Sequence, residues 1–302
     1  MLKVAVSIGD LNGVGIEIAL KAHNNIKDLI RPVYCINKTM LKKAAELLNM
    51  PIPDDFETVD VQGEFDINPG KVDAKAGEYS YNSFIKAVDL AKEKKVDAIT
   101  TLPINKESWM RAGIKYKGHT EVLRDIFKKD AIMMLGCEKM YVALFTEHIP
   151  LKKVCENVKK EKLISFFLDF YKSTGFEKIG VLALNPHAGD GGVLGDEEIN
   201  EIIPAIKDVN AALKKEVFYG PLVPDTAFCS REGRFIAMYH DQGLAPLKAL
   251  YFDESINVSL NLPVLRTSVD HGTAFDIAYK GIADTKSYIN AIKYILNKKS
   301  LM

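Results

Sequence analysis

Four of the six histidines stand directly behind apolar runs that are typical of buried strands. These four are His148, His187, His240 and His271. Neutral imidazoles that converge on one divalent ion, with open positions left for a substrate, are a recurring catalytic arrangement. The sequence has no HExxH motif and no two histidines at helical spacing, so two interpretations stay open. Either three of these histidines share a metal ion, or each satisfies its own local hydrogen bonds. His23 is not a candidate ligand, because it lies in a predicted helix among polar neighbours.

Three hydrogen-bond donors follow His240 on separate predicted loops. They are Lys248, Asn257 and Arg266. A guanidinium group matches a phosphate or carboxylate with two parallel hydrogen bonds, and an ammonium group adds a point charge. These residues could therefore orient an anionic substrate. The alternative is that they form ordinary surface ion pairs, which need no functional explanation.

The elements that must position these residues alternate between strands and helices. Strands are predicted over 2–8, 32–36, 96–101, 131–135, 140–145, 179–184, 217–219, 235–239 and 256–262, and helices over 16–22, 40–48, 79–93, 122–127, 164–171 and 287–297. Alternation of this kind indicates an α/β fold with a parallel sheet under helical cover. Ligands of such sheets collect outside the carboxyl ends of the strands, where the polar residues stand.

The sequence also makes predictions for several loops and turns. The turn Gly9–Gly15 contains three glycines before a helix and could approach an anion, although its spacing is neither a dinucleotide fingerprint nor a P-loop. A plain tight turn is the alternative. Thr120 is predicted to cap the helix at 122–127, 131–145 to form a hairpin, and Gly220-Pro221 to form a turn.

Composition narrows the class of protein. The 302 residues include 40 basic and 40 acidic side chains, so no net charge favours nucleic acid or an anionic membrane. The four cysteines are widely spaced with no CxxC pair, which argues against a thiolate zinc site and a disulfide framework. The first residues do not resemble a signal peptide, and no 18-residue apolar run occurs, so we expect a cytoplasmic enzyme acting on a small metabolite.

Seven phrases of the sequence together resemble one known family. They are GDLNGVGIE (9–17), GHTE (118–121), TEHIPL (146–151), NPHAGDGG (185–192), GPLVPDTAF (220–228), YHDQGLAPLK (239–248) and INVSLNLPVLRTSVDHGTAFDIA (256–278). In this order they are similar to the 4-hydroxythreonine-4-phosphate dehydrogenase family of pyridoxal phosphate biosynthesis. The resemblance implies NAD(P)-dependent oxidation of 4-phosphooxy-L-threonine to 2-amino-3-oxo-4-(phosphooxy)butanoate. That product then loses carbon dioxide to leave 3-amino-2-oxopropyl phosphate.

The resemblance also implies an architecture and an assembly. The family's fold is similar to that of isocitrate and isopropylmalate dehydrogenases, with a cleft between two α/β lobes. We expect an outer lobe over 1–125 plus 265–302, and a central lobe over 126–264 that carries the metal ligands and the dimer contacts. The family forms a homodimer with the active site at the subunit interface, so some ligands are expected from the neighbouring chain.

Site residues follow from the same resemblance. The family's catalytic metal ligands match His148, His187 and His240, which would hold one divalent ion such as zinc, magnesium, cobalt or manganese. Its substrate contacts match His119, Thr120, Lys248, Asn257 and Arg266. The nucleotide loop of the related dehydrogenases is similar to His271, Gly272, Thr273 and Ala274 with Asp276, so these residues are expected to bind NAD or NADP.

Two departures and two alternatives accompany this interpretation. Family members usually carry Pro-Ala where Leu11-Asn12 stands and glycine where Asn261 stands, although asparagine tolerates the left-handed backbone of such a turn. A sister dehydrogenase acting on threonate or erythronate 4-phosphate would use the same metal and cofactor. A phosphate-acyl transferase or a binding protein on the same fold would lack both.

Overall fold

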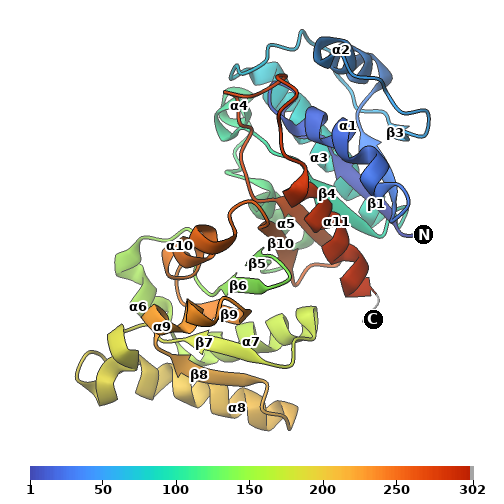
Figure 1. The fold of residues 1–302 in the computed structure, drawn as a ribbon. Helices are drawn as coiled ribbons and strands as arrows, with labels where there is room; N and C mark the ends of the chain where they lie inside the picture. Colours follow the sequence, from blue (N-terminus) through green and yellow to red (C-terminus); the bar gives the residue numbers. More distant parts are fainter. Residues whose placement is uncertain (300–302) are drawn as a thin grey trace. The chain divides into compact units, whose positions relative to one another are not determined.

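The chain forms two compact α/β units in a computed structural model that describes residues 1–299 (Figure 1). Unit 1 comprises Met1–Lys129, Ile256–Val258 and the chain from Leu262 onward. Unit 2 comprises Asp130–Ser255 and Ser259–Asn261. The boundary between the units therefore falls within one strand, β10 (Ile256–Leu260).

Unit 1 is built on a parallel sheet whose strands follow the order β3-β2-β1-β4-β11. Its strands are β1 (Lys3–Ser7), β2 (Arg31–Cys35), β3 (Thr58–Val59), β4 (Ala98–Thr101) and β11 (Leu265–Val269). Its helices are α1 (Gly15–Ile26), α2 (Lys38–Leu48), α3 (Ala74–Lys92), α4 (Lys106–Arg111), α5 (His119–Phe127) and α11 (Lys286–Lys299). Helices cover the sheet, and β1 and β4 are almost wholly buried.

Unit 2 carries a mixed sheet in the order β5-β6-β9-β7-β8. Its strands are β5 (Ile132–Gly136), β6 (Met140–Leu144), β7 (Ile179–Leu182), β8 (Phe218–Leu222) and β9 (Gly233–Ala237). The first two form the predicted antiparallel hairpin, and the other pairs are parallel. Its helical segments are η1 (Leu151–Lys153), α6 (Val154–Asn157), α7 (Lys160–Thr174), η2 (Pro186–Gly192), η3 (Glu198–Ile202), α8 (Ile203–Leu213), α9 (Pro224–Ala227), η4 (Phe228–Ser230) and α10 (His240–Tyr251).

Two local predictions are wrong for identifiable reasons. Thr120 does not cap a helix, because α5 begins one residue earlier, at His119, and Gly118 occupies the cap position. Gly220-Pro221 is not a turn but lies inside β8, where the register with β7 shifts. Strands can accommodate proline at an edge or an irregularity, and β8 is the last strand of the order in unit 2.

Asn261 confirms the expectation for the position where the family usually has glycine. Its φ of 59° lies in the left-handed region. Its backbone nitrogen donates to Ser173 Oγ, and its side-chain amide donates to Asp130 O at 3.0 Å and to Asp169 Oδ2 at 3.1 Å. Glycine could adopt the backbone angle but could not make the two side-chain bonds. Asparagine therefore keeps the turn and adds anchors to it.

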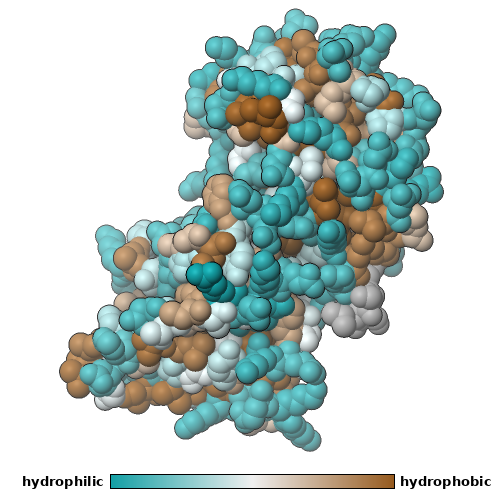
Figure 2. Space-filling model, viewed as in Figure 1, coloured by the Kyte–Doolittle hydropathy of each residue, from teal (hydrophilic) through white to brown (hydrophobic). Residues whose placement is uncertain are grey.

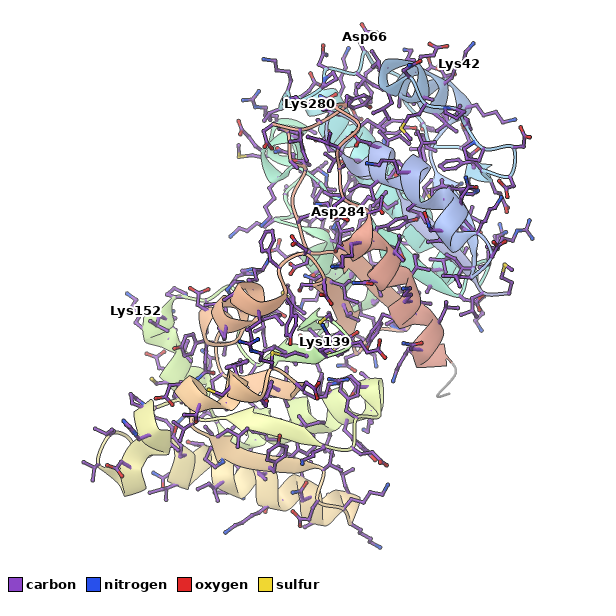
Figure 3. The ribbon with its side chains drawn as sticks, viewed as in Figure 1. Lys42, Asp66, Lys139, Lys152, Lys280 and Asp284 are labelled. Atoms are coloured by element: carbon purple, nitrogen blue, oxygen red, sulfur yellow. The ribbon has the colours of Figure 1, made fainter. Side chains whose placement is uncertain are left out.

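Many charged side chains lie at the surface of the two units. Hydrophilic residues cover much of the face drawn in Figure 2, and charged side chains such as Lys42, Asp66 and Lys152 are exposed on their units (Figure 3). Within residues 1–299, no helix combines the length and the hydropathy needed to cross a membrane.

Candidate functional site

A buried arginine in unit 1 gathers three of the polar residues at the strand ends. Arg266 is only 3% exposed. Its Nε and Nη2 atoms donate to Thr101 Oγ1 at 3.0 and 2.6 Å, and its Nη1 lies 3.4 Å from Asn257 Oδ1. Its Nη2 also lies 3.2 Å from His119 Nδ1. Burial lowers the pKa of Arg266 to about 9, which still leaves the guanidinium charged at neutral pH. An anion is the ligand that this cation favours.

His119 sits beside this guanidinium in an aromatic enclosure. Its ring packs edge-on against Phe84 and Trp109, with centroid distances of 4.5 and 5.6 Å. Burial, and then the charge of Arg266, lower the pKa of His119 well below 6.5. The imidazole is therefore neutral, and since a guanidinium can only donate, Nδ1 must be the acceptor. The proton then resides on Nε2, a buried atom that has no partner among the described residues.

The loops behind β1, β4 and β11 meet at one edge of the unit 1 sheet. These strands are parallel neighbours, so their carboxyl ends lie side by side. The Asp10 amide donates to Pro103 O at 2.8 Å, and the Val14 amide donates to Thr273 O at 3.0 Å. A Cβ at Gly13 would lie 2.8 Å from the Thr273 carbonyl oxygen, so only glycine permits this approach. The glycine turn therefore contacts the candidate nucleotide loop.

Asn12 joins this glycine turn to a third loop. It is fully buried. Its Oδ1 accepts from the Asn68 amide at 2.9 Å, its Nδ2 donates to Lys71 O at 2.9 Å, and its carbonyl accepts from the Gly70 amide at 2.8 Å. An alanine, which the resemblance led us to expect at this position, could not make the two side-chain bonds. Asn12 therefore ties the glycine turn to the loop at 68–71.

Asp10 is a buried carboxyl group in the same turn. Its Oδ1 accepts from the Asn12 amide at 2.9 Å, while its Oδ2 is buried without a partner among the described residues. Burial raises the pKa of Asp10 from 3.8 to about 6, against the lowering effect of the Asn12 amide and the nearby Ser108 side chain. The carboxyl group therefore changes charge close to neutral pH.

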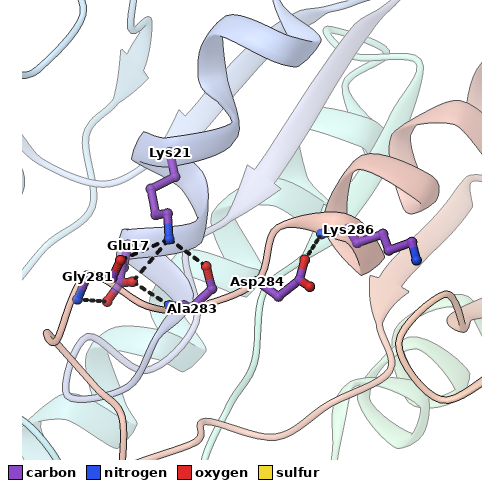
Figure 4. A network of polar contacts seen from close by, with 6 residues as sticks. All are labelled: Glu17, Lys21, Gly281, Ala283, Asp284 and Lys286. Atoms are coloured by element: carbon purple, nitrogen blue, oxygen red, sulfur yellow. Dashed lines mark hydrogen bonds and ion pairs between the residues drawn. The ribbon is translucent and has the colours of Figure 1, made fainter.

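The candidate nucleotide residues form a loop, and hydrogen bonds hold the chain before and after it. Thr273 is buried and Ala274 has a φ of 43°, whereas Gly272 and Asp276 are exposed. His271 Nδ1 lies 2.9 Å from Gly272 O. Further along the chain, the amides of Gly281 and Ala283 donate to the buried carboxylate of Glu17, which Lys21 also contacts (Figure 4).

Two of the three predicted metal histidines lie together in unit 2. The rings of His148 and His240 have centroids 5.4 Å apart. They follow β6 and β9, which are parallel neighbours, and Thr146 Oγ1 donates to Met238 O at 2.6 Å across the two exits. His240 Nδ1 lies 2.7 Å from Asp241 Oδ1. A carboxylate at Nδ1 directs Nε2 toward a cation, which is how metal-binding imidazoles are commonly oriented.

The third histidine does not complete a cluster within the chain. Among residues 1–299, no three His, Cys, Asp or Glu side chains form a group that could hold a metal ion. His187 is exposed and follows β7, in a run of left-handed residues that extends to Gly191. The buried carboxylate of Glu198 fixes the start of this run by accepting from the amides of Leu184 and Asn185. The imidazoles of His148 and His240 are of the chemical type that binds a divalent ion, and His187 does not form a group of three with them among residues 1–299.

The remaining predicted substrate residues occupy two helices. Lys248 lies on α10 of unit 2, with its Nζ 5.4 Å from the centroid of the Phe252 ring. Thr120 is half-buried in the first turn of α5, next to His119. Sequence reasoning did not single out Thr101, Asp10 or Asn12 as site residues. In the sequence, only their position at or directly behind the end of a predicted buried strand could have indicated a role. Many residues without a function occupy such positions.

Comparisons with known proteins first show the fold. The structure of isocitrate dehydrogenase from Methylococcus capsulatus superimposes with a TM-score of 0.50 at 14% identity, over 98% of this chain and 85% of that one. The shared fold confirms the predicted α/β architecture. A family model described as pyridoxal phosphate biosynthetic protein PdxA matches residues 28–295, and the chain belongs to this family.

Relatives agree over nearly the full length. The chain is 62% identical over 296 residues to the 4-hydroxythreonine-4-phosphate dehydrogenase of Sulfurimonas denitrificans, covering 97% of this chain and 96% of that protein. It is 56% identical to the enzyme of the same name from Campylobacter fetus, covering 97% of each. The crystal structure of that dehydrogenase from Klebsiella pneumoniae has a TM-score of 0.80 at 33% identity, over 98% and 97% of the two chains. The protein is therefore an oxidoreductase of this family, and a nicotinamide cofactor follows from that membership.

Proposed function

We propose that the protein oxidises 4-phosphooxy-L-threonine with NAD or NADP and a divalent metal ion. The product, 2-amino-3-oxo-4-(phosphooxy)butanoate, then decarboxylates to 3-amino-2-oxopropyl phosphate, and we expect the enzyme to act in the cytoplasm. The observation that carries the proposal is the buried Arg266–His119 pair, in a chain whose relatives bear the name of this dehydrogenase. A buried cation beside a neutral donor suits a substrate with carboxylate and phosphate groups.

The substrate-binding roles follow from charge and hydrogen-bonding capacity. Arg266 contributes a permanent charge and His119 an Nε2–H donor for one anionic end of the substrate. Lys248 adds a point charge, and Asn257 and Thr120 add neutral hydrogen-bonding groups. Fixed donors that hold both ends of a small substrate supply the orientation on which the rate depends.

The imidazoles supply the ligands of the divalent ion. The chemistry that a divalent ion held there would supply is Lewis-acid polarisation of an alcohol oxygen of the substrate. Asp241 holds His240 in the tautomer whose Nε2 carries a lone pair, and His148 stands next to it. His187 is the proposed third ligand. Imidazole sites suit zinc and cobalt, and magnesium or manganese would need further oxygen ligands.

The nucleotide is proposed to bind along His271, Gly272, Thr273, Ala274 and Asp276. The contact of Gly13 with Thr273 supports this assignment, because it brings the start of α1 close to the loop.

We further propose a homodimer with the active site at the subunit interface. Exposed apolar side chains flank two of the metal histidines in unit 2: Ile149 and Leu151 after His148, and Val193 and Leu194 after His187. Such exposed apolar residues are typical of protein contacts. A second chain would also explain how His187 contributes to a metal site that one chain does not complete. Light scattering should show a dimer, and Val193→Glu should weaken both the dimer and metal retention.

The reaction is tested by following reduced nicotinamide at its absorbance band. Purified enzyme is given 4-phosphooxy-L-threonine with NAD or NADP, before and after chelation, and threonate and erythronate 4-phosphates serve as competing substrates. His187→Ala should abolish turnover and metal retention. His23→Ala is the control: His23 is buried against Tyr34 and Asp55, so this variant should lose stability while the folded enzyme keeps its kcat. Equal activity in both variants, or faster oxidation of the sugar-acid phosphates, would overturn the proposal.

A further inference from the structure

The hydroxyl group of Thr101 restrains the plane of the Arg266 guanidinium. Two donors of the same guanidinium, Nε and Nη2, converge on this one oxygen at 3.0 and 2.6 Å. Both side chains are buried. Two hydrogen bonds to one acceptor restrain rotation about the last side-chain bonds of an arginine, so the remaining donors point in a defined direction.

The backbone around this contact is equally restrained. Thr101 is the last residue of β4 and pairs in register with Ser268 of β11. Ser268 Oγ also donates to the Thr101 carbonyl at 3.1 Å. Arg266 lies two residues before Ser268 and therefore projects from the same face of the sheet. The hydroxyl of Thr101 is thus held at a fixed distance from the root of the arginine side chain.

The orientation of Arg266 in turn determines the hydrogen-bonding state of His119. Nη2, which donates to Thr101, is also the atom that lies 3.2 Å from His119 Nδ1. A rotated guanidinium would withdraw this donor and release the imidazole from its tautomer. The donor that His119 offers through Nε2 therefore depends on an oxygen that belongs to Thr101.

We propose that Thr101 is a positioning residue for anion recognition: its hydroxyl aligns Arg266, and through Arg266 it holds His119 as an Nε2–H donor toward the substrate. This inference rests on the proposed function and deepens it. Thr101 does not itself need to touch the substrate. Its part is to keep these two donors in register for a carboxylate or phosphate.

The chain offers matched substitutions that separate positioning from packing. Thr101→Val keeps the shape of the side chain and removes the acceptor, whereas Thr101→Ser keeps the hydroxyl and removes a methyl group. Thr100 is the control, because it is equally buried on the same strand but faces the other side and bonds to Thr267 Oγ1 at 3.0 Å. Thr100→Val therefore removes a buried hydroxyl contact without disturbing Arg266.

A binding signal is available from the only tryptophan of the sequence, Trp109. Its ring packs against His119, so its fluorescence should report the binding of an anion to the anion-binding group, which we define as Arg266 and His119. The metal-loaded full-length enzyme is titrated with 4-phosphooxy-L-threonine, and separately with NAD. For Thr101→Val we expect the substrate Kd and KM to rise about tenfold or more, as for loss of one charge-assisted contact. We expect kcat to change less than KM and the Kd for NAD to stay constant.

Control variants show whether a loss of substrate binding is specific to the Thr101 hydroxyl. Thr101→Ser and Thr100→Val should keep the substrate Kd within about threefold of the parent. Thr101→Ala replaces Thr101→Val if the valine variant fails to fold, as judged by circular dichroism. A normal substrate Kd in Thr101→Val, or an equal loss in Thr100→Val, overturns the inference. Arg266→Ala separates this failure from that of the proposed function: if it also leaves substrate binding intact, the assignment of the anion-binding group is itself wrong.

Discussion

Nη2 of Arg266 lies 3.2 Å from Nδ1 of His119, and this contact determines which imidazole nitrogen carries the proton. Guanidinium groups have no acceptor, so Nδ1 must present its lone pair. We predict that ¹⁵N chemical shifts of the His119 ring report the neutral Nε2–H tautomer between about pH 6 and 8. In Arg266→Ala the preference should relax toward a mixture. An Nδ1–H ring in the parent enzyme would contradict the assigned contact.

Asp10 should make the free energy of unfolding depend on pH, and this dependence should disappear in Asp10→Asn. Its pKa is raised from 3.8 to about 6 by burial, so between these values the folded state holds a proton that the unfolded state has lost. Stability should therefore fall as pH rises through this window, by about 3 kcal/mol at 1.36 kcal/mol per unit. Asp10→Asn keeps the acceptor for the Asn12 amide and should be more stable than the parent at pH 8 but not at pH 4.

Urea unfolding at the two pH values measures this difference. Asp66→Asn is the control, because Asp66 is an exposed carboxylate in the same unit (Figure 3) and should change the free energy of unfolding little. A parent enzyme that is as stable as Asp10→Asn at pH 8 would show that the buried carboxylate carries no cost.

Asn12→Ala should loosen the loop that Asn12 holds. The variant loses the bonds of Oδ1 to the Asn68 amide and of Nδ2 to Lys71 O, and we expect a loss of about 1–3 kcal/mol of unfolding free energy. Hydrogen exchange at the Asn68 amide should accelerate, and the KM for the nucleotide should rise more than that for the substrate. Asn68→Ala is the matched control, because the Asn68 side chain donates to Asp66 O and the variant leaves the backbone amide of residue 68 unchanged. Equal exchange rates in the two variants would argue against a role for Asn12 in holding the loop.

Glu17→Gln should destabilise the segment behind the nucleotide loop. The buried carboxylate accepts from the amides of Gly281 and Ala283 at 3.3 and 2.7 Å (Figure 4). A glutamine amide would turn its NH₂ group toward one of these donors, and Lys21 would lose its charged neighbour, at a cost of about 2–4 kcal/mol. Thermal unfolding measures the loss. Glu46→Gln, which breaks the exposed helical pair with Lys42, should have almost no effect; a similar change in both variants would contradict the prediction.

The sequence by itself determined the α/β class, most elements and the family. Apolar runs and segments of helical periodicity can be recognised from neighbouring residues alone, because both depend on local chain geometry. The polar residues behind each apolar run mark where a strand ends. It also correctly predicted a left-handed turn at Asn261, because backbone preference is a property of the single residue. The boundaries of α5 and β8 were less accessible, because helix starts and strand irregularities depend on contacts outside the segment.

Only the tertiary structure decided which of the polar residues act together. Thr101 and Arg266 are 165 positions apart, and only the parallel pairing of β4 with β11 brings them into contact. The same pairing of β6 with β9 places His148 beside His240, while His187 stays apart within the chain. Burial and neighbouring charge, which determine the tautomer of His119 and the raised pKa of Asp10, arise only when distant segments exclude water together. Periodicity and spacing record none of this, because they describe neighbours along the chain and not neighbours in space.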